Sequence, residues 1–102
     1  MIVRLWRGWT SQDDAAAYAA LLRTTVLPGI HRIAGYRGAW LLRRDVAEGV
    51  EFVTLTLWDS MDAVRAFAGP DADVAVVPPA ARDLLARFDQ RSTHYDTVMS
   101  PA

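Results

Sequence analysis

The 102-residue sequence contains no cysteine and no lysine, and only two histidines. Without cysteine the chain cannot form a disulfide bond, a thiolate nucleophile or a thiolate metal site. His31 and His94 form no H-x-H or H-x-x-x-H pattern, so we expect no metal site. No glycine-rich phosphate loop follows an expected strand, so no nucleotide or flavin cofactor is expected either.

Neither positive nor negative charge predominates in the sequence. The sequence has 11 basic residues, all of them arginines, and 12 acidic residues, so the formal net charge is −1. The arginines are spread among the acids instead of forming a basic stripe, which argues against nucleic acid and anionic membrane as partners. No apolar run approaches the roughly 20 residues of a membrane span, and the N-terminus does not resemble a signal peptide. We therefore expect a soluble, cytoplasmic protein.

What is present is enough apolar sequence for one core. With 52% hydrophobic and 23% charged residues, the composition is that of a globular protein, and it is not typical of disorder. There is no internal repeat, linker or low-complexity tract, so residues 1–102 are expected to form a single domain.

Local patterns predict the strands and helices. Ser11, with Asp14 three residues later, is a weak capping box that begins a helix, which Pro28 and Gly29 should kink or end. Ser60 should cap a second helix. Pro79 could begin a third, which carries Ala81, Leu84, Leu85 and Phe88. Residues 45–50 should form a turn-rich connector, and 71–79 a loop or short helix. Strands are expected at 2–9, 35–44, 51–58 and 91–98.

The resulting order, β-α-β-β-α-(α)-β, predicts an α+β fold of the ferredoxin-like, split βαβ type. It has a four-stranded antiparallel sheet with helices on one face. Within 51–58, alternation separates Val53, Leu55 and Leu57 from Phe52, Thr54, Thr56 and Trp58. The face without helices is therefore apolar, and an exposed apolar face is typical of a partner site. We predict a homodimer packed sheet to sheet.

Short motifs along nearly the whole chain carry a family resemblance. They are WRG at 6–8, LPGI at 27–30, GYRG at 35–38, LLRR at 41–44, EFVTLTLWDS at 51–60, VRAFAG at 64–69, VVPPAARDLL at 76–85 and HYD at 94–96. With these, the chain resembles the antibiotic biosynthesis monooxygenase-like proteins of the dimeric α/β-barrel superfamily. The resemblance implies a dimeric α/β barrel. The superfamily includes cofactor-free oxygenases, haem degraders and isomerases.

Departures from the motifs of relatives narrow what the resemblance implies. Haem-degrading relatives carry a tryptophan nine residues after the W-x-S tryptophan and a haem-ligating histidine ten beyond that. Phe67 and Val77 stand at these positions here, so no haem is expected. Quinone-forming relatives place a polar amide four residues before that tryptophan and a tyrosine six after it. This chain keeps Trp58 but has Thr54 and Val64.

Two residues are candidates for catalysis. His94 lies in the expected last strand, and the ordinary histidine pKa near 6.5 suits a general base. Asp96 shares its strand face and could orient the imidazole, whereas Tyr95 points to the opposite face. The alternative is an ordinary sheet histidine bonded to a neighbour, beside a solvated carboxylate.

Six further residues are candidates for contacting a substrate. Trp58 could line a cavity or be a core aromatic residue. Arg4 could neutralise an enolate, or pair with an acid across the sheet as Arg7 could. Tryptophans on other strands could share the cavity wall or pack in the core. The candidates are Trp58, Thr54, Thr56, Trp6, Arg4 and Phe67.

Residues and resemblance together predict a cofactor-independent monooxygenase acting on a small aromatic or polyketide-type substrate. Such a site needs a base, a cation or donor for the oxyanion, and a dry apolar pocket. Two alternatives stay open. One is a dimer that binds a small apolar ligand without turnover. The other is an isomerase or cyclase that uses the same base without oxygen.

Overall fold

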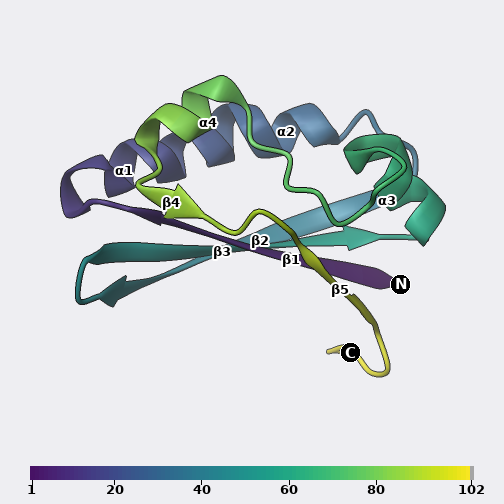
Figure 1. Cartoon of the computed structure of the whole chain (residues 1–102). Helices are drawn as coiled ribbons and strands as arrows, with labels where there is room; N and C mark the ends of the chain where they lie inside the picture. Colours follow the sequence, from purple (N-terminus) through teal and green to yellow (C-terminus); the bar gives the residue numbers. More distant parts are fainter. Residues whose placement is uncertain (102) are drawn as a thin grey trace.

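The computed structural model describes residues 1–101. A five-stranded antiparallel sheet forms one layer, and the helices form a second layer on one of its faces (Figure 1). The elements are β1 (Ile2–Thr10), α1 (Gln12–Leu21), the π-helical η1 (Leu22–Val26), α2 (Leu27–Ile30), β2 (Tyr36–Val46), β3 (Gly49–Trp58), α3 (Met61–Ala68), α4 (Pro79–Leu84), β4 (Arg87–Phe88) and β5 (Thr93–Asp96). The predicted ferredoxin-like fold class is confirmed.

The sheet has the order β2-β3-β1, and both β4 and β5 pair with the remaining edge of β1. The prediction of four strands is therefore wrong by one: the C-terminal strand consists of two short pieces. β4 pairs with Gly8 and Trp9, and β5 pairs with residues 2–5. Phe88, expected in the last helix, lies in β4 instead. The helix ends at Leu84, and the Ala86 amide already donates to the Trp9 carbonyl at 2.7 Å, so the chain has joined the sheet.

The hairpin between β2 and β3 is tighter than expected. The two strands pair as far as Val46 and Gly49, so the predicted connector at 45–50 shrinks to a short turn. Gly49 has a φ of +141° and packs against the backbone of Thr10. A side chain has no room there, and this backbone region favours glycine.

The first helical segment begins and ends close to the predicted positions. Ser11 caps it as expected, its hydroxyl accepting from the Asp14 amide at 3.1 Å. It continues through the π turn of η1 into α2, which contains Pro28 and Gly29 and ends at Ile30. A π turn and a proline are both common where a helix bends. The segment therefore stays long enough to cover the centre of the sheet (Figure 1).

The second helix confirms its predicted start. The Ser60 hydroxyl accepts from the Ala63 amide at 3.2 Å, and α3 ends before Gly69, whose φ is +99°. Residues 71–78, left open between a loop and a short helix, form a loop with one bridge between Val74 and Arg91. This loop carries the chain from α3 to α4 across the helical layer (Figure 1).

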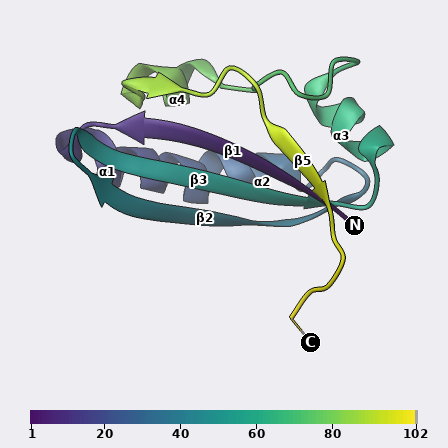
Figure 2. The ribbon, with the colours of Figure 1, turned by 60° about the horizontal axis from the view of Figure 1, so that its bottom comes forward.

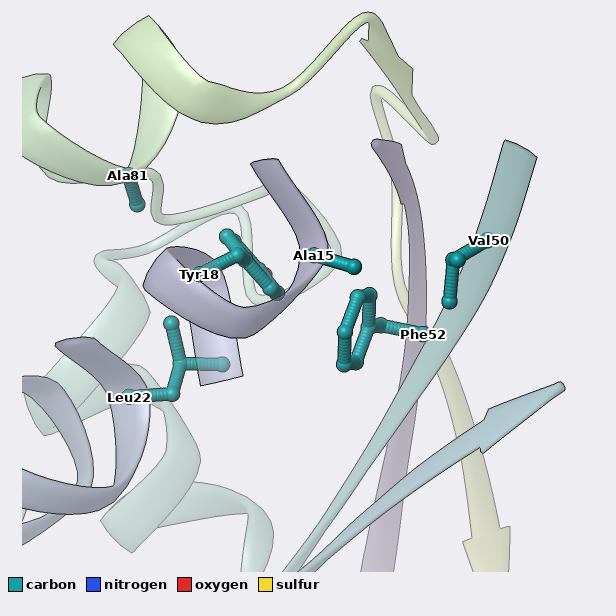
Figure 3. Close-up of a cluster of buried hydrophobic side chains, with 6 residues drawn as sticks. All are labelled: Ala15, Tyr18, Leu22, Val50, Phe52 and Ala81. Carbon is teal, nitrogen blue, oxygen red and sulfur yellow. The ribbon is translucent and has the colours of Figure 1, made fainter. Parts of the chain in front are cut away.

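The hydrophobic core has two clusters between the layers. The first joins α1 and η1 to β3, with the Tyr18 ring tilted on the Phe52 ring at a centroid distance of 4.8 Å (Figure 3). The second surrounds Trp58, which is fully buried against Val64 of α3 and Ile30 of α2. Between residues 1 and 101, no helix is long and apolar enough to cross a membrane.

The other sheet face carries no helix in the part of the chain described (Figure 2). The register places Trp40, Leu55 and Leu5 side by side across β2, β3 and β1 on this face, as the alternation in 51–58 predicts. Trp40 is 61% exposed and Tyr95, on β5, is 53% exposed. The face without helices is thus apolar and open in the single chain.

Candidate functional site

A cavity of about 60 Å³ lies between the sheet and the helices, and it is partly open to solvent. Its floor comes from β1 and β3, and its roof from the α1–η1–α2 segment. Residues 76–78 and α4 close one side, and Phe67 of α3 closes another. The wall is mainly apolar, as is usual for small-molecule sites. The polar side chains that line it are Arg4, Tyr18, Thr54, Thr56 and Ser92.

Arg4 is the one charged residue among those that line the cavity in the described chain, and it is only 4% exposed. Its guanidinium donates to the carbonyl oxygens of Ala72 and Val74 in the loop, the latter at 2.9 Å. It also lies over the Phe67 ring, 5.6 Å from the centroid. Burial lowers the pKa of Arg4, and the charge of Asp73 partly opposes this shift.

His94 stands directly beside Arg4, because the two residues are register partners on β5 and β1. Nε2 of His94 lies 3.0 Å from Nη1 of Arg4, and Nδ1 lies 2.9 Å from a carboxylate oxygen of Asp73. A guanidinium can only donate, so Nε2 accepts, and the ring proton resides on Nδ1 and is donated to Asp73. Burial, and next the Arg4 charge, lower the pKa of His94. The imidazole is therefore neutral at neutral pH.

This geometry changes the interpretation of His94. The residue points to the helix side of the sheet but is not among those that line the cavity, and both of its ring nitrogens are occupied. Asp96 is exposed, and the carboxylate that orients His94 is Asp73 of the loop. The expectation that Asp96 would orient the imidazole is therefore corrected.

Hydroxyl groups supply the other polar atoms of the cavity. Thr54 Oγ1 and Ser92 Oγ are buried and have no hydrogen-bond partner among residues 1–101. Thr56 Oγ1 accepts from the Trp58 indole at 2.8 Å, which leaves the hydroxyl proton of Thr56 free to be donated. Buried polar groups without partners are uncommon and call for an explanation. A bound ligand would satisfy them.

The predicted aromatic residues divide between wall and core. Trp6 and Phe67 line the cavity. The Trp6 indole donates to the Asp89 carbonyl at 2.7 Å, which fixes the ring. Trp58 does not line the cavity. It is fully buried beneath it and stacks on Phe67 with centroids 5.2 Å apart, so the core alternative holds for Trp58.

Other predicted residues lie away from the cavity. Arg7 points to the opposite sheet face and pairs with Asp89 at 2.8 Å. Tyr95 is on the face without helices, as expected. His31 follows α2 at the surface, edge-on to Tyr36.

Sequence reasoning missed several residues of the site, among them Ser92, Asp73 and most of the apolar wall supplied by the helices. Ser92 could have been found, because it is two residues before His94 and alternation puts both on one side of the chain. Asp73 gave no signal, since it lies in an irregular loop 21 residues away from His94. No group of three or more potential ligand side chains in the described residues is placed to hold a metal ion.

The fold recurs in solved structures. The monooxygenase ActVA-Orf6 of Streptomyces coelicolor, in complex with nanaomycin D, is 15% identical, with a TM-score of 0.61 over 99% of this chain and 92% of that chain. The cofactor-independent oxygenase SnoaB of Streptomyces nogalater is 20% identical, with a TM-score of 0.63 over 97% and 94%. The haem degrader MhuD of Mycobacterium tuberculosis, solved with two haems in its active site, is 16% identical, with a TM-score of 0.64 over the whole of both chains.

Several candidate antibiotic biosynthesis monooxygenases share the fold as well. The chain has the fold of these proteins. These matches agree with the family that the sequence resembles, and at such identities they establish the fold alone. No protein-family model matches the chain, and no curated protein matches it in sequence.

The cavity does not fit a haem like those that MhuD binds. Haem iron needs an axial ligand, and among residues 1–101 no histidine lines the cavity. His94 is bonded at both nitrogens, and His31 lies at the surface. Burial raises the pKa of the Tyr18 hydroxyl, so Tyr18 is not a ready phenolate ligand.

Proposed function

We propose that the protein is a cofactor-independent monooxygenase that oxidises a small aromatic or polyketide-type compound in the cavity beside Arg4. The observation that carries the proposal is the buried Arg4 guanidinium at the wall of an apolar cavity. The fold supports it, since a cofactor-independent oxygenase shares it. A charge in an apolar site stabilises an oxyanion far more strongly than one in water.

The proposed reaction needs no external reductant. An anthrone-type ring loses a proton to form an anion, and this electron-rich anion reduces dioxygen. One oxygen atom becomes the new carbonyl of the quinone, and the other leaves as water with two hydrogen atoms of the substrate. Arg4 would stabilise the anion, while Trp6 and Phe67 would hold the ring in an apolar wall.

In this proposal His94 is not the general base that the sequence suggested. Both nitrogens are bonded, so it contributes through Arg4 instead of taking the substrate proton itself. No carboxylate or free imidazole lines the cavity in the described residues. The substrate is therefore one acidic enough to ionise against the Arg4 charge, with solvent at the open side taking the proton.

Oxygen uptake tests the proposal. Purified protein with an anthrone in an oxygen electrode should consume one dioxygen per quinone formed, and Arg4→Met should lower kcat/KM by about 10²-fold or more, as for the loss of an oxyanion donor. Arg32→Met, at an exposed arginine after α2, is the matched control. No uptake with any ring substrate would contradict the proposal, and product formed without uptake would indicate an isomerase or cyclase.

A second candidate function is a binding protein without turnover. It is favoured by the same lack of a free base among the cavity residues described. Such a protein would bind the aromatic compound and return it unchanged. Binding without oxygen uptake or product would distinguish it from the oxygenase.

We also propose that two chains pack through the sheet faces without helices. Trp40, Leu42 and Tyr95 are large apolar side chains left exposed on that face. The C-terminal residues leave the sheet on the same side (Figure 1), and Val98 there is 98% exposed. A second copy would cover both features, since an isologous interface joins the same face of each chain. A sedimentation mass near 11.3 kDa would contradict the dimer.

A further inference from the structure

Arg4 differs from the other arginines in what surrounds its charge. Four exposed arginines, Arg7, Arg37, Arg44 and Arg91, pair directly with carboxylates at 2.6–2.8 Å, and the remaining ones apart from Arg4 are exposed to solvent. Arg4 is buried, and its three hydrogen-bond partners are two carbonyl oxygens and a neutral imidazole. Asp73, the nearby acid, bonds to His94 instead. A buried charge without a direct counter-charge is costly, and an anion in the cavity would offset that cost.

The guanidinium also has donors to spare. Arginine carries five N–H groups, and three of them are used by the loop carbonyls and by His94. Two N–H groups are therefore left without a protein acceptor within residues 1–101, on a side chain that lines the cavity. They can hold an oxygen atom of a ligand.

The hydroxyls around Arg4 point to the same ligand chemistry. Ser92 Oγ and Thr54 Oγ1 are buried without partners within the described residues, and Thr56 Oγ1 accepts from the Trp58 indole and keeps its own O–H available as a donor. Ser92 is only 6% exposed. No side chain that lines the cavity in the described chain is acidic, so the polar set comprises a cation and hydroxyl donors. This combination suits an anionic oxygen on an apolar body.

His94 and Asp73 hold Arg4 in place. The neutral imidazole accepts from Arg4 and donates to Asp73, so the three side chains form one chain of hydrogen bonds from the cavity wall to the loop. Protonation of His94 would remove the acceptor and set two cations 3.0 Å apart. The arrangement therefore requires a neutral histidine.

We propose that the cavity binds a small aromatic anion, a carboxylate or phenolate whose charged oxygen is held by Arg4, and that His94 and Asp73 are positioning residues that aim Arg4 at it. The inference rests on the proposed function only for the location of the ligand. It names the ligand class and holds for an oxygenase and for a binding protein alike.

A pair of matched probes tests the charge preference on the whole chain. 2-Naphthoate and 2-naphthamide have the same ring, and only the first is anionic. Calorimetric titration should show 2-naphthoate binding roughly tenfold or more tightly, as expected for a hydrogen bond to a charged group. Arg4→Met should abolish this preference, and the control Arg32→Met, at an exposed position, should keep it. Equal affinity of both probes for the unaltered protein, or no binding of either, would overturn the inference.

Two substitutions of His94 separate positioning from proton transfer. His94→Gln keeps a side-chain acceptor for Arg4 and removes the titratable ring, so the preference for 2-naphthoate should stay within about threefold of its original value. His94→Leu removes the acceptor and should reduce the preference to near that of Arg4→Met. The affinity for 2-naphthamide reports an intact cavity in each variant. A preference unchanged in His94→Leu would overturn the positioning role, and it can be measured even if Arg4→Met does not fold.

The anion site and the oxygenase can fail separately. Equal kcat/KM of the unaltered protein and Arg4→Met with an anthrone would overturn the anion site and leave an oxygenase. A 2-naphthoate preference without oxygen uptake from any ring substrate would support the anion site and remove the oxygenase. A pH profile of kcat/KM that follows the pKa of the substrate would support the positioning role of His94. If the pH profile of kcat/KM is instead the same for substrates of different acidity, and this pH dependence disappears in His94→Gln, the positioning role of His94 is overturned.

Discussion

Nε2 of His94 accepts a hydrogen bond from Nη1 of Arg4 across 3.0 Å, on neighbouring strands whose residues are 90 positions apart in sequence. Because of this contact, His94 is placed to orient the Arg4 guanidinium and not to act as a general base. It also links a strand of the sheet to the loop at 71–78, because Asp73 bonds to the other ring nitrogen and Arg4 bonds to two loop carbonyls.

This contact predicts a pH dependence of stability. The pKa of His94 in the fold lies below its unfolded value of about 6.5. The unfolded chain therefore binds the proton more readily, so the stabilising contribution is fully present above about pH 6.5 and is lost as the pH falls towards the folded pKa. The charged groups around the ring are Arg4 and Asp73, with Arg91 3.7 Å from Asp73.

Urea unfolding at about pH 7.5 and pH 5 measures this contribution. Between these pH values, His94→Gln should lose less free energy of unfolding than the unaltered protein, because the neutral amide does not titrate. Equal losses in His94→Gln and the unaltered protein would show that His94 does not couple to folding.

Two threonines of β3 should respond in opposite ways to the same substitution. Thr56→Val leaves the buried Trp58 indole without its acceptor and should cost about 1–3 kcal/mol of unfolding free energy. Thr54→Val removes a buried hydroxyl that has no partner in the described structure, so stability should stay the same or rise. The urea midpoints of the two variants measure the difference. A larger loss of unfolding free energy in Thr54→Val than in Thr56→Val would contradict the assigned hydrogen bond.

Two glycines make a second matched pair. Gly49 has a φ of +141°, and an added Cβ would meet the Thr10 carbonyl oxygen, so Gly49→Ala should be strongly destabilising. Gly29 lies in α2 with open space around it, so Gly29→Ala should stabilise by about 0.4–1 kcal/mol. Thermal unfolding of both variants tests the prediction, which requires Gly49→Ala to have the lower Tm.

The proposed dimer predicts an effect confined to one face of the molecule. Trp40→Asp places a charge on the exposed apolar sheet face, where Trp40 is 61% exposed, and should give a sedimentation mass of one chain. Ala17→Asp introduces the same charge at an exposed position of α1 on the helical side and should leave the mass of two chains. Dissociation by Ala17→Asp, or a dimer retained by Trp40→Asp, would point to another interface.

Much of the fold follows from local patterns in the sequence. Ser11 and Ser60 begin helices because their hydroxyls satisfy free amides of the first turn. The alternation in 51–58 separates the two sheet faces, because strand side chains alternate whatever the partner strand is. The ends of helices and strands are harder to predict from sequence where tertiary contacts determine them. Phe88 joins the sheet edge instead of extending α4.

Local patterns in the sequence predict most of the elements, their order, the apolar sheet face and five residues of the cavity wall, which are Arg4, Trp6, Thr54, Thr56 and Phe67. These depend on periodicity and on motifs that lie within single elements. The role of His94 depends on tertiary contacts. Its partners come from β1 and from an irregular loop, and no local pattern determines which carboxylate reaches a ring nitrogen. The same reason explains why Trp58 is core and Asp73, not Asp96, orients the histidine: contacts between distant segments depend on packing, which a single stretch of sequence does not encode.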